Sequence, residues 1–403
     1  MVTTQPTFAR TDALAATLTP ILAFLPGYRR RVGQPGVVDL TFGNPHESPL
    51  PGIAQALRRW AEPQHGQWFA YPESLPEAQA TVAASLRAWR GLPFEAPDIA
   101  MTNAGFGALA VGLKAVTVPG DEVIFSLPPW FAYEQLCLDN GLTPVKVRHE
   151  PATWDLDLAA IAAAITPRTR VIIVNTPCNP TGRIYPPATL DRLAGILAEA
   201  SMRYGRAIYI LADEPYSRLV FDDKPFHSPS AHYPNTLIAY SYGKVLCAPG
   251  QRIGFLALAP AMPDREAVRQ AVFLAQMACA YAFPNALLQR AIGDLDPLSI
   301  DLAHLQRKRD RMLDALRAQG YDVHTPEGTF YLFPRSPIAD DVAFAEALAE
   351  RGVLVIPGAA FEQPGYFRVC LTATDAMLDQ ALPAFAAAIA ANRAVAAPAP
   401  IRR

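Results

Sequence analysis

The sequence predicts an α/β fold, with a large domain built on a mostly parallel β-sheet sandwiched by helices and a smaller α+β domain after it. Up to about residue 285, short runs of β-branched and other apolar residues alternate with helical patterns. This alternation is typical of strands that are buried on both faces of a parallel sheet. From about residue 286 the order changes to a long charged helix followed by strands and further helices. The 403 residues are enough for two domains that each have a core.

The large domain is expected over residues 45–285, after an N-terminal arm and first strand (1–44) that pack with the small domain. The first strand is expected at 37–42, directly before Gly43-Asn44-Pro45. The later strands are expected at 99–102, 122–125, 143–147, 171–174, 207–211, 236–240 and 254–258. The intervening helices are expected at 108–116, 131–140, 157–165 and 190–203. The 39 prolines are scattered and are expected mostly at turns.

The small domain is expected over residues 286–392 and contains a different order of elements. Its helices are expected at 298–319, 341–351 and 375–392, and its strands at 328–333, 353–356 and 367–371. The tail, 393–403, is rich in alanine and proline and is expected to be disordered.

The composition argues against several classes of protein. A net charge of −2 provides no basic surface for nucleic acid or for a membrane. The five cysteines are dispersed and form no C-x-x-C pair, so we expect reduced thiols in a cytoplasmic protein and no metal site. The apolar stretch 13–25 follows Asp12, contains Pro20 and lacks a basic leader, which does not fit a signal peptide. No run reaches the roughly 18 apolar residues that a membrane span needs.

Lys244 is one of only five lysines among 35 basic residues, and its neighbours suggest a cofactor site. Ser241 lies three residues before it, and Arg252 lies eight residues after it, across a Pro-Gly turn. An amine, a hydroxyl and a guanidinium together suit an aldehyde that carries a phosphate. Pyridoxal 5'-phosphate is the cofactor that needs all three groups.

Two further motifs follow predicted strands. Asn179 lies in the run Asn175–Gly182 after the strand at 171–174, and Asp213 and Tyr216 follow the strand at 207–211. In parallel sheets, ligands bind at the carboxyl ends of the strands. A carboxylate such as that of Asp213 can keep a pyridine nitrogen protonated, whereas Asn179 and Tyr216 can bond the phenolic oxygen of the ring. Lys244 can then act as general acid and base.

With these motifs in this order, the chain resembles the class I/II aminotransferases, which are pyridoxal-phosphate enzymes of fold type I related to aspartate aminotransferase. The resemblance covers roughly residues 37–390. It implies transfer of an amino group between an L-amino acid and a 2-oxo acid by a ping-pong mechanism. It also implies a homodimer whose active sites are shared between the subunits.

The resemblance also implies roles for single residues. Lys244 matches the lysine that forms the Schiff base with the cofactor, and Asp213 and Tyr216 match catalytic residues that contact its ring. Asn179 matches the residue that bonds the ring oxygen and contacts the substrate, and Trp130 matches the ring that stacks on the cofactor. Ser241, Arg252 and the turn Ala104-Gly105-Phe106 match the groups that bind the phosphate, and Tyr71 matches the tyrosine that reaches the phosphate in the neighbouring subunit. Gly43 and Arg368 match the residues that bind the substrate carboxylate.

Several positions depart from the family pattern. Pro72-Glu73-Ser74-Leu75 stands where the family usually has glycine and then Leu-Arg, and Phe106 is bulkier than usual. Gly243 and Gln251 replace a common serine and a common tryptophan. These departures leave open another pyridoxal-phosphate reaction on an amino acid, namely β-elimination, decarboxylation, cyclisation or oxidation.

A third hypothesis is a catalytically silent cofactor-binding regulator. Such proteins usually carry a fused DNA-binding domain, for which the sequence has no room ahead of Asp39 and no basic face. The substrate side chain is not readable from the motifs, although an apolar or aromatic pocket is suggested by Phe24, Tyr28, Trp68, Phe69 and Tyr133.

Overall fold

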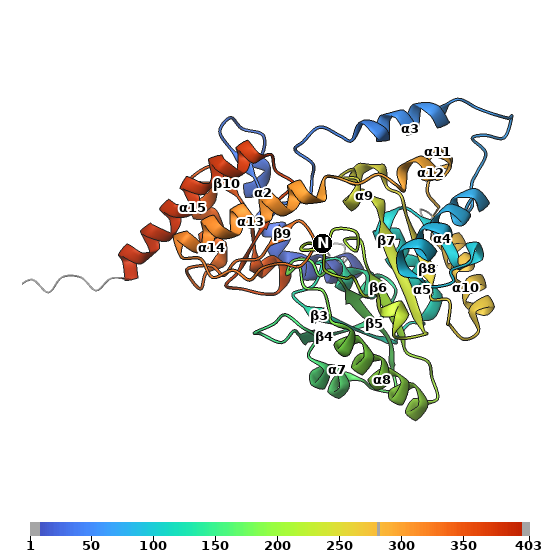
Figure 1. The fold of residues 1–403 in the computed structure, drawn as a ribbon. Helices are drawn as coiled ribbons and strands as arrows, with labels where there is room; N and C mark the ends of the chain where they lie inside the picture. The colour runs from blue at the N-terminus through green and yellow to red at the C-terminus, as the bar shows by residue number, and fades with distance from the viewer. Residues whose placement is uncertain (1–8, 280–282, 397–403) are drawn as a thin grey trace, which may run out of the picture.

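The computed structural model describes residues 9–279 and 283–396, and Figure 1 shows their arrangement. The helices are α1 (Ala9–Thr17), α2 (Thr19–Arg31), α3 (Pro51–Ala61), α4 (Pro76–Arg90), α5 (Ala104–Val116), α6 (Tyr133–Asp139), α7 (Leu158–Ala164), α8 (Pro187–Tyr204), α9 (Tyr242–Val245), α10 (Arg265–Ala278), α11 (Ala286–Arg290), α12 (Ile292–Leu295), α13 (Leu302–Gln319), α14 (Asp341–Ala349) and α15 (Asp375–Ala396). The strands are β1 (Val38–Asp39), β2 (Ile99–Thr102), β3 (Glu122–Leu127), β4 (Thr143–Arg148), β5 (Thr169–Asn175), β6 (Tyr209–Asp213), β7 (Thr236–Ser241), β8 (Gly254–Leu258), β9 (Tyr331–Leu332), β10 (Val353–Leu354), β11 (Ile356–Pro357) and β12 (Phe367–Cys370).

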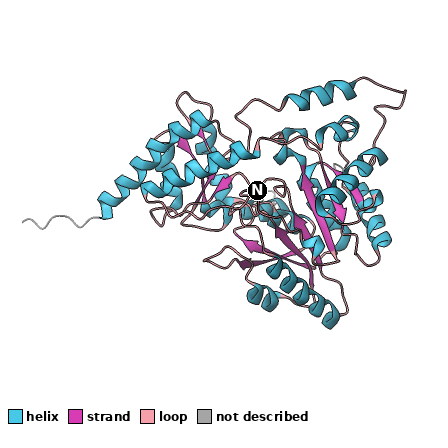
Figure 2. Cartoon of the chain, in the orientation of Figure 1, coloured by secondary structure: helices cyan, strands magenta, loops and turns pink. Residues whose placement is uncertain are grey.

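The central sheet has seven strands in the order β2-β8-β7-β6-β5-β3-β4. All neighbouring strands run parallel except at β8, which is antiparallel to both β7 and β2. Side chains of β5 alternate between the two faces, as a strand requires. Ile173 packs with α5 and α10, whereas Ile172 and Val174 pack with α7 and α8. Helices therefore cover both faces (Figure 2), and the predicted mostly parallel α/β sheet is confirmed.

The C-terminal part of the chain contains two small sheets. β11, β12 and β9 form an antiparallel sheet, and β1 pairs in parallel with β10. The β1–β10 pair joins the N-terminal segment to the C-terminal part, with Val38 opposite Val353. The helices α13, α14 and α15 lie together beside these sheets, away from the edge strand β4 of the large sheet (Figure 1).

The segment that leads into β9 is tied to the loops of the large sheet. Glu327 accepts a hydrogen bond from the backbone of Ile184 at 2.9 Å and pairs with Arg183 at 3.1 Å and Lys224 at 2.7 Å. Gly182 packs against Pro326 so closely that a Cβ there would contact it and would lie 2.8 Å from the Gly328 carbonyl oxygen. We call these contacts of Glu327 and Gly182 the Glu327 clasp.

Several elements differ from the sequence predictions. The expected arm contains α1 and α2, and α3, α4 and α10 were not expected. The helix expected from Ala108 begins at Ala104, so the predicted turn at 104–106 is its first turn. The helix expected from residue 298 begins at Leu302, and α15 extends to Ala396, so residues 393–396 are helical rather than disordered. The remainder of the predicted tail, 397–403, lies outside the described residues.

Proline explains several of the missed helices. α3 and α4 each begin with a proline, and α2 has one in its first turn. Proline is favourable there because the first N–H groups of a helix have no intrahelical partner and its φ already fits the helix. The boundaries at residues 44 and 285 stay predictions. None of the described helices is long and apolar enough to cross a membrane.

Candidate active site

A cavity opens at the carboxyl ends of β5, β6 and β7, beside the start of α5. Its lining residues are Ala104, Gly105, Phe106, Leu109, Trp130, Asn175, Asn179, Asp213, Pro215, Tyr216, Ser241, Lys244 and Arg252. Ten of the thirteen residues predicted for the site are among them. Of the other three, Arg368 donates to the lining residue Asn179, Gly43 packs against Phe330 and Tyr331 behind the lining, and Tyr71 does not line the cavity.

One end of the cavity carries groups that suit a phosphate. Ser241 ends β7, and a Cβ on Gly105 would lie 3.5 Å from the Ser241 Cβ. Gly105 belongs to the first turn of α5, where backbone N–H groups lack helical partners and favour anions. Arg252 lies at the same end and is exposed, with one guanidinium nitrogen bonded to the Pro249 carbonyl oxygen at 2.8 Å. A hydroxyl, a guanidinium and a helix N-terminus thus line this end together.

The close approach of β8 to α5 shapes this end. Ala104 has a φ of 60°, and Gly254 of β8 lies directly against it. A Cβ on Gly254 would lie 2.8 Å from the Ala104 Cα and would also contact the Tyr240 carbonyl oxygen. Only glycine leaves room for this approach.

Asp213 lies in the floor of the cavity, where it is 5% exposed. Its Oδ2 accepts hydrogen bonds from the Tyr133 hydroxyl at 2.5 Å and from Asn175 Nδ2 at 3.2 Å. Burial raises the pKa of Asp213 to about 7, although the Tyr133 hydrogen bond and the Lys244 charge act in the opposite direction. A buried carboxylate of this kind is stabilised by a cation placed beside it.

Lys244 lies in α9, directly after β7, and lines the cavity. In the described part of the chain it forms no ion pair with a carboxylate, and its nitrogen lies 5.6 Å from the centre of the Tyr216 ring. Burial lowers the pKa of Lys244 to about 8, with the nearby Arg368 and Arg252 charges acting in the same direction. A substantial fraction of the amine is therefore neutral and nucleophilic near pH 8.

Arg368, on β12, is buried and reaches toward the cavity through Asn179. It donates to Asn179 Oδ1 at 2.9 Å and to the Thr41 carbonyl oxygen at 2.9 Å, while its Nε has no partner. Its guanidinium lies 4.1 Å from the centre of the Tyr331 ring. Gly43 packs against this same ring, since a Cβ there would lie 2.9 Å from the Tyr331 hydroxyl. The predicted carboxylate residues Arg368 and Gly43 therefore meet around Tyr331.

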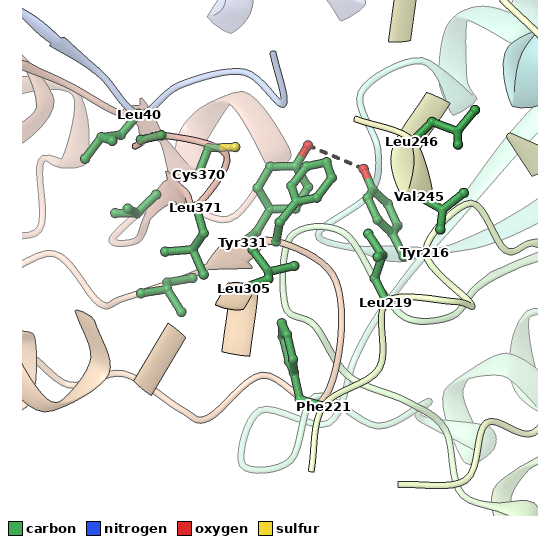
Figure 3. Packing of buried hydrophobic residues seen from close by; sticks show 14 of the residues in the cluster. Leu40, Tyr216, Leu219, Phe221, Val245, Leu246, Leu305, Tyr331, Cys370 and Leu371 are labelled. Atoms are coloured by element: carbon green, nitrogen blue, oxygen red, sulfur yellow. Dashed lines mark hydrogen bonds between the residues drawn. The ribbon is translucent and has the colours of Figure 1, made fainter. Parts of the chain in front are cut away.

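Tyr331 joins this carboxylate region to the predicted ring-oxygen ligand Tyr216. The two hydroxyls lie 3.4 Å apart within a buried cluster (Figure 3). Burial raises the pKa of Tyr216 well above its usual range, so its hydroxyl keeps its proton and can donate.

Two aromatic rings border the cavity. Phe106 lies edge-on to Trp130, with ring centres 5.2 Å apart, and Phe106 is 39% exposed. Trp130 also contacts the Tyr133 ring, with centres 5.6 Å apart. Tyr71, in contrast, is fully exposed in the segment between α3 and α4.

Asn175, Tyr133 and Gly254 were not predicted from the sequence to have a role at the cofactor. Asn175 begins the run Asn175–Gly182, and its position directly after the predicted strand at 171–174 was the available signal. Tyr133 and Asp213 are 80 residues apart, and no local pattern links them.

Comparison with known proteins decides the family. The model for "Aminotransferase class I and II" matches residues 35–385. The chain belongs to this family. It is therefore a pyridoxal-phosphate-dependent transaminase, which moves an amino group between an amino acid and a 2-oxo acid. The predicted family, fold, cofactor and activity are confirmed.

Curated relatives and solved structures agree with this assignment. The aminotransferase is 32% identical over 359 residues to the aspartate/prephenate aminotransferase of Thermus thermophilus, covering 87% of this chain and 90% of the relative. An aminotransferase structure from Eubacterium rectale superposes with a TM-score of 0.88 at 27% identity, over 96% of this chain and 100% of the other. The structure of the Thermus thermophilus aspartate aminotransferase with maleate superposes with a TM-score of 0.81 at 27% identity, over 96% of this chain and 100% of the other.

These matches give no support to the alternatives, another pyridoxal-phosphate reaction or a silent regulator. Within the described ranges, no group of three or more His, Cys, Asp or Glu side chains could hold a metal ion.

Proposed function

We propose that this aminotransferase acts on an L-amino acid whose side chain is apolar or aromatic and carries no second carboxylate. The charge of the cavity supports this proposal. Among the described lining residues, the cations are Lys244 and Arg252, and Arg368 lies behind Asn179. Lys244 is needed for the cofactor aldehyde, Arg252 for the phosphate and Arg368 for the substrate α-carboxylate, so none of the three is left for a second carboxylate. A second carboxylate would meet the exposed ring of Phe106 instead of a positive charge.

The residues of the cavity fit pyridoxal phosphate. Ser241, Arg252 and the first turn of α5 would hold its phosphate, and Asp213 would pair with its pyridine nitrogen. Trp130 would cover one face of the ring. The unpartnered Nε of Arg368 is a buried donor that a substrate carboxylate could satisfy.

Bound pyridoxal phosphate supplies an aldehyde for amines and a ring that accepts electrons from a carbanion. Lys244 would hold the cofactor before substrate arrives and then move the proton at the substrate Cα. Asp213 would keep a proton on the pyridine nitrogen. Asn179 and Tyr216 would bond the ring oxygen, and Arg368, with Gly43 beside it, would orient the substrate carboxylate.

The substrates in the names of the curated relatives, aspartate and prephenate, each carry two carboxylates. Our proposal therefore assigns this chain a different preference. The test is a panel of amino acids, each added to the holoenzyme while the cofactor absorbance is followed and then restored with a 2-oxo acid. We expect kcat/KM for leucine or phenylalanine to exceed that for aspartate by about ten-fold or more. A preference for aspartate or glutamate would overturn the proposal.

A matched variant isolates the role of Phe106. F106K places a cation at the border of the cavity, and we expect it to shift the kcat/KM ratio toward aspartate. F131K provides a control, because Phe131 follows Trp130 but does not line the cavity. An equal shift in both variants would assign the effect to general charge and not to Phe106.

We also propose a cytoplasmic homodimer in which Tyr71 reaches the phosphate site of the partner. Support comes from the full exposure of Tyr71 and from exposed apolar residues on α10, namely Phe273, Leu274 and Met277. All five cysteines are free thiols, which suits a reducing compartment.

A further inference from the structure

We infer that Tyr133 is a positioning residue that holds the Asp213 carboxylate through Oδ2 and so presents Oδ1 to the pyridine nitrogen of the cofactor. Asn175 donates to the same oxygen. The inference rests on the proposed role of Asp213 and extends it to two residues that contact Asp213 from neighbouring elements.

The sheet brings these side chains together. β3, β5 and β6 are adjacent, and Asn175 and Asp213 are paired at the carboxyl ends of β5 and β6. The segment after β3 leads to α6, of which Tyr133 is the first residue. The Tyr133 side chain is buried between Phe125 and Trp130, with ring centres at 5.7 and 5.6 Å. Its hydroxyl is therefore fixed in place before any ligand binds.

The direction of each hydrogen bond follows from its partners. A carboxylate oxygen can only accept, so Tyr133 donates to Asp213 Oδ2 at 2.5 Å. Asn175 Oδ1 accepts from the Asn179 backbone N–H at 2.7 Å, which turns its Nδ2 toward Asp213. Asn175 Nδ2 also donates to the Asp213 carbonyl oxygen at 2.8 Å. No hydrogen bond among the described residues ends on Asp213 Oδ1.

Tyr133 also affects the basicity of Asp213. Burial raises the pKa of this carboxyl, and the Tyr133 hydrogen bond opposes that rise. Burial keeps Tyr133 itself protonated, since the pKa of its hydroxyl lies well above the usual range. Lys244 and Glu214 are the charged groups nearby, and they act in opposite directions. A less basic Asp213 leaves the shared proton on the pyridine nitrogen, where the reaction needs it.

Tyr185 provides a matched control because it is a buried tyrosine in the same region. The Leu127 carbonyl oxygen can only accept, so His149 donates to it from Nδ1 at 2.9 Å. Burial lowers the pKa of His149 to about 4, so the ring is neutral and its Nε2 accepts from the Tyr185 hydroxyl at 2.7 Å. Tyr133 and Tyr185 therefore each donate one buried hydrogen bond, but only Tyr133 donates to Asp213.

The experiment uses holoenzyme reconstituted with pyridoxal phosphate labelled with ¹⁵N in its ring, and reads the nitrogen chemical shift by NMR. The wild type and Y185F should show a protonated pyridine nitrogen, and D213N an unprotonated one. Y133F should lower the ratio of protonated to unprotonated nitrogen by about ten-fold, the equivalent of one pKa unit. Where Y133F does not retain cofactor, N175S tests the same oxygen, with a smaller change in the same direction.

The outcomes distinguish the proposed role of Asp213 from the inferred role of Tyr133. If D213N keeps the wild-type shift, the proposed role of Asp213 is wrong and the inference falls with it. If D213N shifts but Y133F and N175S match the wild type, only the inference is overturned. The inference is also overturned if Y133F and Y185F change the shift equally, because then the loss of any buried hydroxyl suffices.

Discussion

Burial shifts the pKa values of Lys244 and Asp213 toward each other. It lowers that of Lys244 to about 8 and raises that of Asp213 to about 7, so the charged form of each group is less favourable than it is in water. The two are not paired with each other; instead Tyr133 and Asn175 bond the acid, and the amine lies over the Tyr216 ring. The site is therefore prepared for a ligand that carries a complementary cation and an aldehyde.

The rate at which the apoprotein takes up pyridoxal phosphate should rise with pH, with a midpoint near pH 8, and level off about one pH unit above it. At pH 8 about half of the Lys244 amine is neutral, whereas well under 1% of an ordinary lysine is. The measurement is stopped-flow absorbance of the cofactor at a series of pH values. K244A should not take up the cofactor in this covalent form, and K114A, which changes an exposed lysine of α5, should behave as the wild type. An uptake rate that still increases at pH 10 would contradict the lowered pKa of Lys244.

The pH dependence of the thermal stability of the apoprotein should reflect the raised pKa of Asp213. Its pKa is higher in the folded state, so the folded protein binds more protons than the unfolded chain between about pH 4 and 7. The contribution of Asp213 to stability therefore falls as the pH rises through this window. The melting temperature of D213N relative to the wild type should rise from pH 4 to pH 7 and then stay level. A difference that does not change with pH would show that burial does not shift this carboxyl.

The contact between β8 and α5 should be intolerant of even one added methyl group. G254A forces apart Gly254 and the first turn of α5, so we expect a loss of about 2 kcal/mol or more in stability and weaker cofactor binding. G195A is the matched control, because Gly195 is exposed in α8 with no atom near its Cβ position. The free energy of unfolding of G195A should be about 0.5–1 kcal/mol higher than that of the wild type. Chemical denaturation and cofactor titration measure both effects, and equal stability of G254A and wild type would refute the packing argument.

The strands were predictable because a buried strand has a local signature, a short apolar run bounded by turns. The predicted positions of Asn179, Asp213 and Lys244 at or just after the ends of β5, β6 and β7 follow from those runs alone. Contacts between segments that are distant in the chain have no local pattern in the sequence. Tyr133 appeared only as one of several aromatic residues that suggested an apolar pocket, because the bond to Asp213 depends on strand order. α1 and α2 were missed because their apolar pattern is weak, and in α2 prolines also interrupt it.

Mixing two inactive variants should restore activity if the active sites are shared in a homodimer. K244A lacks the amine, and Y71A lacks the proposed contact to the partner's phosphate site. A mixed dimer has one site with both defects and one site with neither, so mixing equal amounts should recover about one quarter of wild-type activity. Sedimentation analysis checks the dimer itself. K244A mixed with Y204A, which changes a half-buried tyrosine of α8, should show only what Y204A supplies alone.

The Glu327 clasp determines when the substrate-binding geometry is set. Arg183, Lys224 and the Ile184 backbone hold the segment before β9, and β9 is paired with β12, which carries Arg368. The position of the Arg368 guanidinium is therefore coupled to the loops that contain Asn179 and Tyr216. Its conformational entropy is lost when the chain folds and not when the substrate binds, so little further ordering of this residue opposes binding. The carboxylate of an incoming amino acid meets a receptor that is already rigid.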